Sequence, residues 1–183
     1  MLLKQPANNF PITDEGYMLQ QLRLFFTDLV TKVNALQYIH STIYSAQDMG
    51  GANGTSHYPE WDGSELYKDS LFSHSVTANP SRISVNESGR YSIYWNIGIT
   101  QGGSARTTFM SSLRINGSVV DTKSRQRNYS RGSGYGDSSV GVKTEIDLDA
   151  GDYVEACVTV EDTDGVYVSD TIPEECELII RKI

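Results

Sequence analysis

Cysteine and histidine are scarce in this chain, and their scarcity excludes several classes of protein. The sequence has two cysteines, Cys157 and Cys176, and three histidines among 183 residues. Two cysteines are too few for a disulfide scaffold, so we expect two small buried apolar side chains; a bridge between them is the alternative. Neither His57 nor His74 forms a metal-ligand spacing with the other or with the cysteines. We therefore expect no metal centre and no cofactor.

Long hydrophobic runs are absent, and positive charge is in the minority. No apolar run reaches the length of a membrane-spanning helix, which predicts no membrane insertion. The N-terminal residues lack the basic stretch and apolar block of a secretion signal, so export by the ordinary route is not expected. Lysine and arginine number 15 against 23 acidic residues, for a net charge of −8. Because general nucleic-acid binding needs a cationic surface, we expect no nucleic-acid partner.

The most informative feature is a change in the spacing of the apolar residues. They first follow steps of three and four, as in a helix whose one face meets a partner helix. Residues 14–46 are therefore predicted to form a helical stem that associates with copies of itself. The predicted seam consists of Leu19, Leu22, Phe26, Leu29, Val33, Leu36, His40 and Ile43.

The segments on either side of the predicted stem lack such a pattern. Residues 1–13 are polar and contain two prolines, which predicts an extended anchoring arm. Residues 47–60 include Gly50, Gly51 and Gly54, which predicts a flexible hinge. The alternative to a stem is one amphipathic helix packed against its own β domain. The regular repeat and the following hinge favour the stem.

From about Leu66 onward the apolar residues alternate with polar ones, as expected of half-buried strands. The clearest strand runs from Arg90 to Ile99, and Asn116-Gly117 is the turn that a two-residue hairpin favours. Further strands are predicted at 107–115, 140–148, 154–160, 166–168 and 178–183. With no helical pattern between them, residues 61–183 are predicted to form an antiparallel sandwich or jelly roll.

Three short motifs carry a resemblance to a known family. They are Ser88-Gly-Arg-Tyr-Ser-Ile93 at a strand start, Leu113-Arg-Ile-Asn-Gly117 in a hairpin, and Leu148-Asp-Ala-Gly-Asp-Tyr-Val154. Their order and spacing over residues 61–183 resemble the C1q/TNF-like jelly roll. The segment Asp14-Glu-Gly-Tyr-Met-Leu-Gln-Gln-Leu looks like the N-terminal segments of tailed-phage virion proteins.

The resemblance implies a homotrimer with a C-terminal head carried on the helical stem. We expect a structural virion protein, a head fibre or capsid decoration (cement) protein, that is not an enzyme. The arm and stem would bind other virion proteins, above all the major capsid protein. The expected location is the virion, assembled in the host cytoplasm.

One basic and aromatic segment suggests an alternative function. Its members are Lys123, Arg125, Arg127, Tyr129, Arg131 and Tyr135, in an otherwise acidic chain. These residues are the candidates for contact with a host-surface glycan, which would make the chain a receptor-binding tail protein or adhesin. The competing interpretation is a solvated, mobile connection between two strands.

Two other features suggest chemistry more weakly. Asp162 and Asp164 are spaced like part of a calcium loop but lack the later glutamate of an EF-hand, so a surface turn is expected there. Some C1q-like trimers bind calcium, so the resemblance keeps that possibility open. An enzyme acting on polysaccharide would need paired carboxylates, whereas the acidic residues here are scattered over predicted turns.

Overall fold

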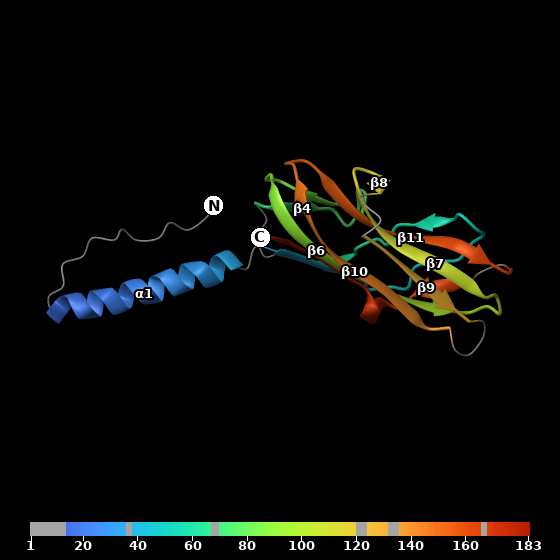
Figure 1. The fold of residues 1–183 in the computed structure, drawn as a ribbon, viewed down its shortest axis with the longest axis horizontal. Helices are drawn as coiled ribbons and strands as arrows, with labels where there is room; N and C mark the ends of the chain where they lie inside the picture. Colours follow the sequence, from blue (N-terminus) through green and yellow to red (C-terminus); the bar gives the residue numbers. More distant parts are fainter. Residues whose placement is uncertain (1–13, 36–37, 67–69, 120–123, 132–135, 166–167) are drawn as a thin grey trace. The chain divides into compact units, whose positions relative to one another are not determined.

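The computed structural model describes residues 14–35, 38–66, 70–119, 124–131, 136–165 and 168–183 (Figure 1). The chain divides into two compact units, Met1–Gln37 and Tyr38–Ile183. The predicted arm at residues 1–13 lies outside the described residues. We call Tyr38–Ile183 the β unit.

The first unit contains one α-helix, α1 (Asp14–Ala35). Acidic residues at positions 14 and 15 suit the positive end of the helix. Leu22, Phe26 and Leu29 of the predicted seam are 41–50% exposed. Phe25 lies on the same side of the helix and is 60% exposed, so the apolar stripe is wider than a two-position seam.

The predicted helix is wrong from Tyr38 onward. Strand β1 (Tyr38–Thr42) follows instead, and it pairs with a strand on each side. Ile39, Ser41 and Ile43 alternate into the core of the sandwich. The heptad spacing continued through His40 and Ile43 by coincidence, while the polar Ser41 concealed the alternation typical of a strand. His40 and Ile43 are therefore not part of a helical seam, and Leu36 lies outside the described residues.

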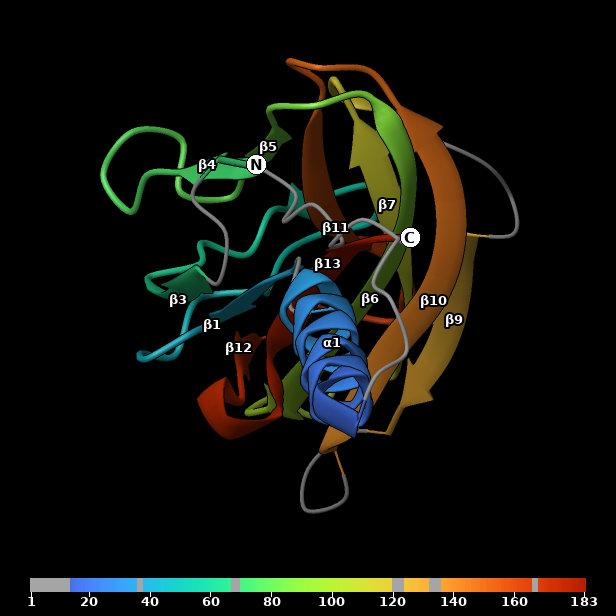
Figure 2. The same ribbon diagram turned by 90° about the vertical axis from the view of Figure 1, so that its left-hand side faces the viewer.

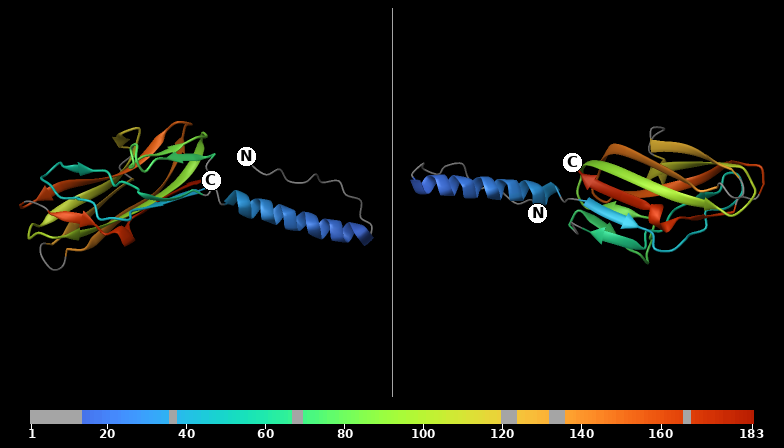
Figure 3. Two further views of the ribbon diagram at one scale, coloured as in Figure 1. Left: turned by 180° about the vertical axis from the view of Figure 1, so that it is seen from behind. Right: turned by 90° about the horizontal axis from the view of Figure 1, so that it is seen from below.

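The β unit is a sandwich of two antiparallel sheets (Figure 1). The first sheet has the order β10-β6-β13-β1-β3, and β12 also pairs with β6. Figure 3 shows β1, β13 and β6 running side by side. The strands added here are β3 (Gly63–Leu66), β6 (Gly89–Gln101), β10 (Ser138–Leu148), β12 (Ser169–Thr171) and β13 (Glu177–Lys182). A 3-10 turn, η2 (Pro173–Glu175), precedes β13.

The second sheet has the order β4-β5-β11-β7-β8, with β2 paired to β11 and β9 paired to β7. Asn116 and Gly117 have φ values of 51° and 77° and form the predicted tight turn between β7 and β8. The strands are β2 (Ser56–His57), β4 (Phe72–His74), β5 (Ile83–Val85), β7 (Thr107–Ile115), β8 (Ser118–Val119), β9 (Arg125–Ser130) and β11 (Tyr153–Thr163).

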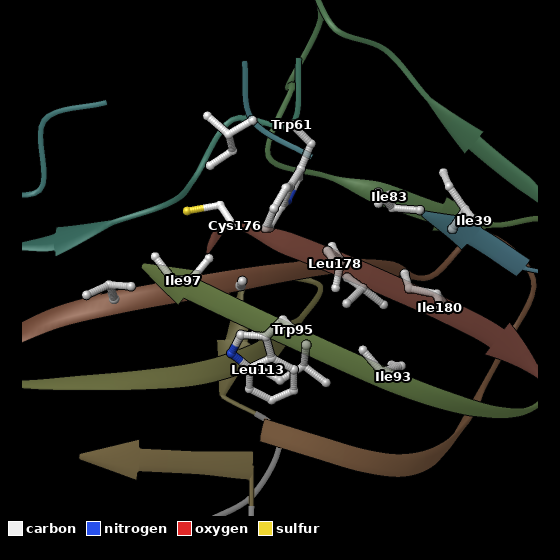
Figure 4. Close-up of a cluster of buried hydrophobic side chains, with 14 of the residues drawn as sticks. Ile39, Trp61, Ile83, Ile93, Trp95, Ile97, Leu113, Cys176, Leu178 and Ile180 are labelled. Carbon is white, nitrogen blue, oxygen red and sulfur yellow. The ribbon is translucent and has the colours of Figure 1, made fainter. Parts of the chain in front are cut away.

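The core lies between the two sheets, and both tryptophans are buried in it (Figure 4). The predicted inward face of β6 is confirmed, because all five of its apolar residues are fully buried. Trp95 on β6 donates a hydrogen bond from Nε1 to the hydroxyl of Ser111 on β7, at 2.6 Å. The hydrogen bond gives the buried indole N–H a partner where water cannot reach it, and it links the two sheets.

The predicted hinge at residues 47–60 is wrong, because this segment is part of the sandwich. Met49 is buried in the core, and its backbone nitrogen donates to the carbonyl oxygen of Ser169. Strand β2 pairs with β11, and His57 contacts the carbonyl oxygen of Gly50 at 2.7 Å. The glycines there serve turns within the sandwich rather than a link between units. The sandwich therefore begins at Tyr38 rather than at residue 61.

The other strand predictions mostly agree with the structure. Strands β7, β10 and β11 cover the predicted ranges 107–115, 140–148 and 154–160, and β13 covers 178–182 of the predicted 178–183. The strand predicted at 166–168 is wrong at Val168, because this residue is exposed and β12 begins only at Ser169. Val166 lies outside the described residues. Both cysteines are buried and free, which confirms small buried side chains and shows no bridge.

Candidate functional site

The outer face of the second sheet carries a buried carboxylate held by an arginine. Glu155 on β11 is 4% exposed although its side chain points away from the core. Its Oε1 atom accepts hydrogen bonds from Arg82 Nε at 2.9 Å and from the hydroxyl of Ser81 at 3.0 Å. This ion pair raises the pKa of Arg82, and the hydrogen bond to Glu155 is the largest cause. Arg82 also lies 4.4 Å above the centre of the Tyr153 ring.

A second arginine lies on the neighbouring strand. Arg114 on β7 is the cross-strand partner of Glu155, and its guanidinium lies 5.2 Å from the centre of the Tyr58 ring. Burial is the main cause that raises the pKa of the Tyr58 hydroxyl, and the nearby Cys157 is the second cause. Among the described residues, Arg82 is therefore the arginine that forms the ion pair with Glu155.

A pocket of about 330 Å³ opens beside Arg82. Its floor is a row of three residues on adjacent strands, Ser73 on β4, Ser84 on β5 and Tyr153 on β11. The turn between β4 and β5 forms one wall, which includes Asn79 at a positive φ of 56°. Sequence reasoning missed this site because its residues are isolated hydroxyls and one arginine, without a motif in the sequence.

The segment predicted as a glycan contact or a mobile connection is largely a strand. Arg125, Arg127 and Tyr129 alternate along β9 and are exposed. Arg127 forms two hydrogen bonds with Glu161 on β11, at 2.5 and 2.9 Å, so its guanidinium is held to the sheet. Arg131 is exposed just after β9, whereas Lys123 and Tyr135 lie outside the described residues.

Strand β9 lies beside β10 of the first sheet at the edge of the sandwich (Figure 2). Asn128 donates to the carbonyl oxygen of Ser139, and Gln126 accepts from the backbone nitrogen of Gly141. These bonds place β9 against β10 and fix the strand in position. The interpretation as a mobile connection is therefore wrong for residues 125–130.

A larger pocket, of about 690 Å³, lies on the outer face of the first sheet. His40, Asn96, Glu175 and Glu177 line it. His40 Nε2 lies 3.4 Å from a carboxylate oxygen of Glu177. Carboxylates give this pocket an acidic character, so any ligand there would carry positive charge or hydrogen-bond donors.

Cys176 borders the same pocket but is not suited to act as a nucleophile. Its thiol is buried and lies 3.2 Å from the carbonyl oxygen of Ile172 and 3.6 Å from that of Gly98. Burial is the main cause that raises the pKa of Cys176 to about 11. A thiol with that pKa is almost entirely protonated at neutral pH, so it lacks the thiolate that nucleophilic chemistry requires.

The weak calcium candidates do not come together as a site. Asp164 Oδ1 accepts a hydrogen bond from the backbone nitrogen of Arg106 at 2.6 Å, and Asp162 is exposed near the end of β11. Within the described ranges, no three histidine, cysteine or acidic side chains gather closely enough to hold a metal ion. The carboxylate of Asp164 thus serves a turn.

The remaining candidate residues are on α1. Leu22, Phe26 and Leu29 are exposed, and Leu19 and Val33 fall within the helix. None of the helical residues that the structure describes forms a segment long and apolar enough to cross a membrane. An apolar stripe on a charged, polar helix is typical of a surface that meets another polypeptide.

Comparison with known proteins identifies the fold. No protein-family profile and no curated protein matches the chain. The β unit is similar to two crystal structures of murine APRIL, determined at pH 8.0 and pH 5.0. Both have a TM-score of 0.53, with 13% and 12% identity, and both alignments cover 80% of this chain and 98% of that one. An Eiger TNF structure from S. frugiperda aligns at a TM-score of 0.47 and 12% identity, covering 80% of this chain and 92% of that chain.

At these identities the likeness concerns architecture alone. It agrees with the resemblance of the three sequence motifs to the C1q/TNF-like jelly roll. The β unit is an antiparallel sandwich with a TNF-like jelly-roll fold.

Proposed function

We propose that the chain is a homotrimeric structural protein that displays its β unit on a self-associating N-terminal helix. The arm and the helix would fasten it to a tailed-phage virion, as a head fibre or capsid decoration protein bound to the major capsid protein. Catalysis has no part in this proposal.

The observation that carries the proposal is the exposed apolar stripe of α1. Leu22, Phe25, Phe26 and Leu29 are all at least 41% exposed on one side of the helix. Apolar area removed from water contributes about 25 cal/mol per Å², so association of these stripes is favourable. Helices in proteins gain most of their stability from the packing of an apolar face rather than from intrinsic propensity, so the helix itself favours a partner.

The connection between helix and sandwich supports the same proposal. Helix α1 ends at Ala35 and β1 begins at Tyr38, so only two residues separate them. Such a linker spans roughly 10 Å at most from the last helical residue to the strand, and associated helices would therefore gather their β1 strands. Strand β1 belongs to the first sheet. On the outer face of this sheet, Ile179 pairs with both His40 and Tyr94 and is half-buried. This face is the one that we expect to meet neighbouring subunits, and the number three follows from the C1q/TNF resemblance.

A pair of variants tests the helical association. Phe26→Asp places a charge in the stripe, and Gln20→Asp places the same charge on the opposite, exposed side of the helix. Phe26→Asp should shift size-exclusion elution towards the single chain at micromolar concentration, while Gln20→Asp should elute as the wild type does. Equal elution of all three proteins as one assembled species would contradict the proposal.

Location in a particle is tested separately by cryo-electron microscopy of intact virions. Density for the chain on the capsid shell would support decoration, and density at the tail tip would support the second candidate function. Absence of the chain from purified particles, checked by mass spectrometry, would contradict both virion functions while leaving the oligomeric state open to its own test.

The second candidate function is binding of a host-surface glycan. The observation that favours it is the exposed row of Arg125 and Tyr129 on β9, because arginine binds anionic groups and tyrosine stacks on sugar faces. Retention of the isolated β unit on a glycan array, and its loss in Arg125→Gln, would favour this function. Arg127→Gln is less informative, because Arg127 is already bound to Glu161.

A further inference from the structure

The pocket beside Arg82 has a polar floor built by regular structure rather than by a loop. Ser73 pairs with Ser84, and Ser84 pairs with Tyr153, so these side chains lie in one row on the outer face of three adjacent strands. The hydroxyl of Ser73 donates to Asn86 Oδ1 at 2.8 Å, which leaves its oxygen able to accept. A rigid row of hydroxyls matches the hydroxyl groups of a polyol.

Arg82 is held in position at the rim of this floor. Its Nε atom is occupied by Glu155, and the face of its guanidinium rests on Tyr153. Its terminal amino groups make no hydrogen bond with any other residue that the structure describes. A guanidinium fixed by its Nε and its face still offers those amino groups to a carboxylate or phosphate, which arginine binds through two parallel hydrogen bonds.

The side chains that line the pocket favour an anion. Among the residues that the structure describes, the lining includes Arg82 and no carboxylate. Glu155 contacts Arg82 but does not line the pocket. Asp152 lies next to Tyr153 in sequence, and its two carboxylate oxygens accept from Asn116 Nδ2 and from the backbone nitrogen of Asp149. The carboxylate of Asp152 is therefore engaged in the adjoining turns.

From this geometry we infer that the pocket binds one acidic sugar unit, with its carboxylate or phosphate on Arg82 and its hydroxyls on the Ser73–Ser84–Tyr153 row. The volume of about 330 Å³ is at the small end for ligand sites, which suits a single sugar unit. Glu155 is a positioning residue, because it contacts Arg82 and not the ligand. Every residue of the site belongs to one chain, so the inference does not depend on the oligomeric state.

The first experiment uses the wild-type chain and maps binding by NMR. Amide shifts are followed during titration with glucuronate, N-acetylneuraminate, glucose 6-phosphate, glucose and inorganic phosphate. We expect shifts at Ser73, Ser84 and Tyr153 with the acidic sugars and none with glucose; the stronger of the carboxylate and phosphate sugars identifies the anionic group. Equal binding of glucose, equal binding of inorganic phosphate and glucose 6-phosphate, or no shifts at these residues would overturn the inference.

The second experiment measures affinity in variants with the best ligand from the titration. Arg82→Gln should weaken binding about tenfold or more, because it removes a charge-assisted pair of hydrogen bonds. Arg125→Gln removes the same charge from β9, outside this pocket, and should leave affinity within about twofold of the wild type. Ser84→Ala offers a second test that spares the Arg82–Glu155 ion pair, and it should weaken binding severalfold. Loss of binding in Arg125→Gln alone would assign the ligand to β9 and overturn this site.

Discussion

Trp95 on β6 and Ser111 on β7 form a buried hydrogen bond of 2.6 Å between the two sheets of the sandwich. Both side chains are essentially inaccessible to solvent. Removal of the serine hydroxyl would leave the indole N–H without a partner, which costs about 1–3 kcal/mol. Ser111→Ala should therefore lower the free energy of unfolding by about that amount, measured by urea denaturation.

A serine on the surface provides the control for this prediction. Ser139 is exposed on β10, and Ser139→Ala should change the free energy of unfolding by less than about 0.5 kcal/mol. If the two variants were equally stable, the hydrogen bond would not contribute to the stability of the sandwich.

A close approach of two backbones predicts a difference between two glycines. A Cβ atom on Gly141 would lie 2.5 Å from the carbonyl oxygen of Trp95, whereas one on Gly165 would meet Ala105 at an ordinary 3.6 Å. Gly141→Ala should therefore destabilise the β unit by about 1–3 kcal/mol, because β10 must move away from β6. Gly165→Ala should have a much smaller effect. Thermal unfolding of both variants checks the ranking, and a reversal would mean that β10 and β6 are not this close.

The buried thiol of Cys176 predicts a dependence of stability on pH. Its pKa is raised from an ordinary 9.0 to about 11 in the folded state, mainly by burial. The folded state thus keeps its proton where the unfolded state loses it, and the resulting stability is complete below pH 9 and is lost as pH rises towards 11.

Comparison with Cys176→Ala isolates this contribution from other groups that titrate in the same range. The free energy of unfolding of the wild type should fall relative to that of the variant between pH 9 and 11. Alkylation of Cys176 by iodoacetamide in the native protein at pH 8 should also be far slower than in urea. A difference between the two proteins that does not change with pH would contradict the assigned burial effect.

Two arginine–glutamate pairs on the same sheet face differ in burial and should differ in their effect on stability. The Glu155 side chain is 5% exposed, and that of Glu161 is 23% exposed. Removal of Arg82 leaves a buried carboxylate without a charge partner, while the carboxylate left by removal of Arg127 is more accessible to water. Arg82→Gln should lower the urea midpoint more than Arg127→Gln does. The opposite order would show that Glu155 is not desolvated as described.

The strands of the sandwich could be predicted because their burial alternates without interruption. Tyr91 to Ile99 on β6 places an apolar residue at every second position, and Asn116-Gly117 forms the turn that its composition favours. Strand β1 could not be predicted in the same way, because Ser41 is polar yet fully buried. Its neighbours happened to continue the heptad spacing of the preceding helix.

The candidate pocket was beyond sequence reasoning for a different reason. Glu155 sits at an outward position of β11, where a charged residue normally indicates solvent, and its burial depends on Arg82 from a distant segment. The row of Ser73, Ser84 and Tyr153 exists only after three strands have paired in register. Such convergence of separate segments leaves no periodic signal in the sequence.

The central claim is that the apolar stripe of α1 assembles three chains, and sedimentation equilibrium of the full-length protein tests it most directly. We expect a mass three times the 20.3 kDa of one chain across micromolar concentrations. A mass of 20.3 kDa over that range would show a single chain and would contradict the claim.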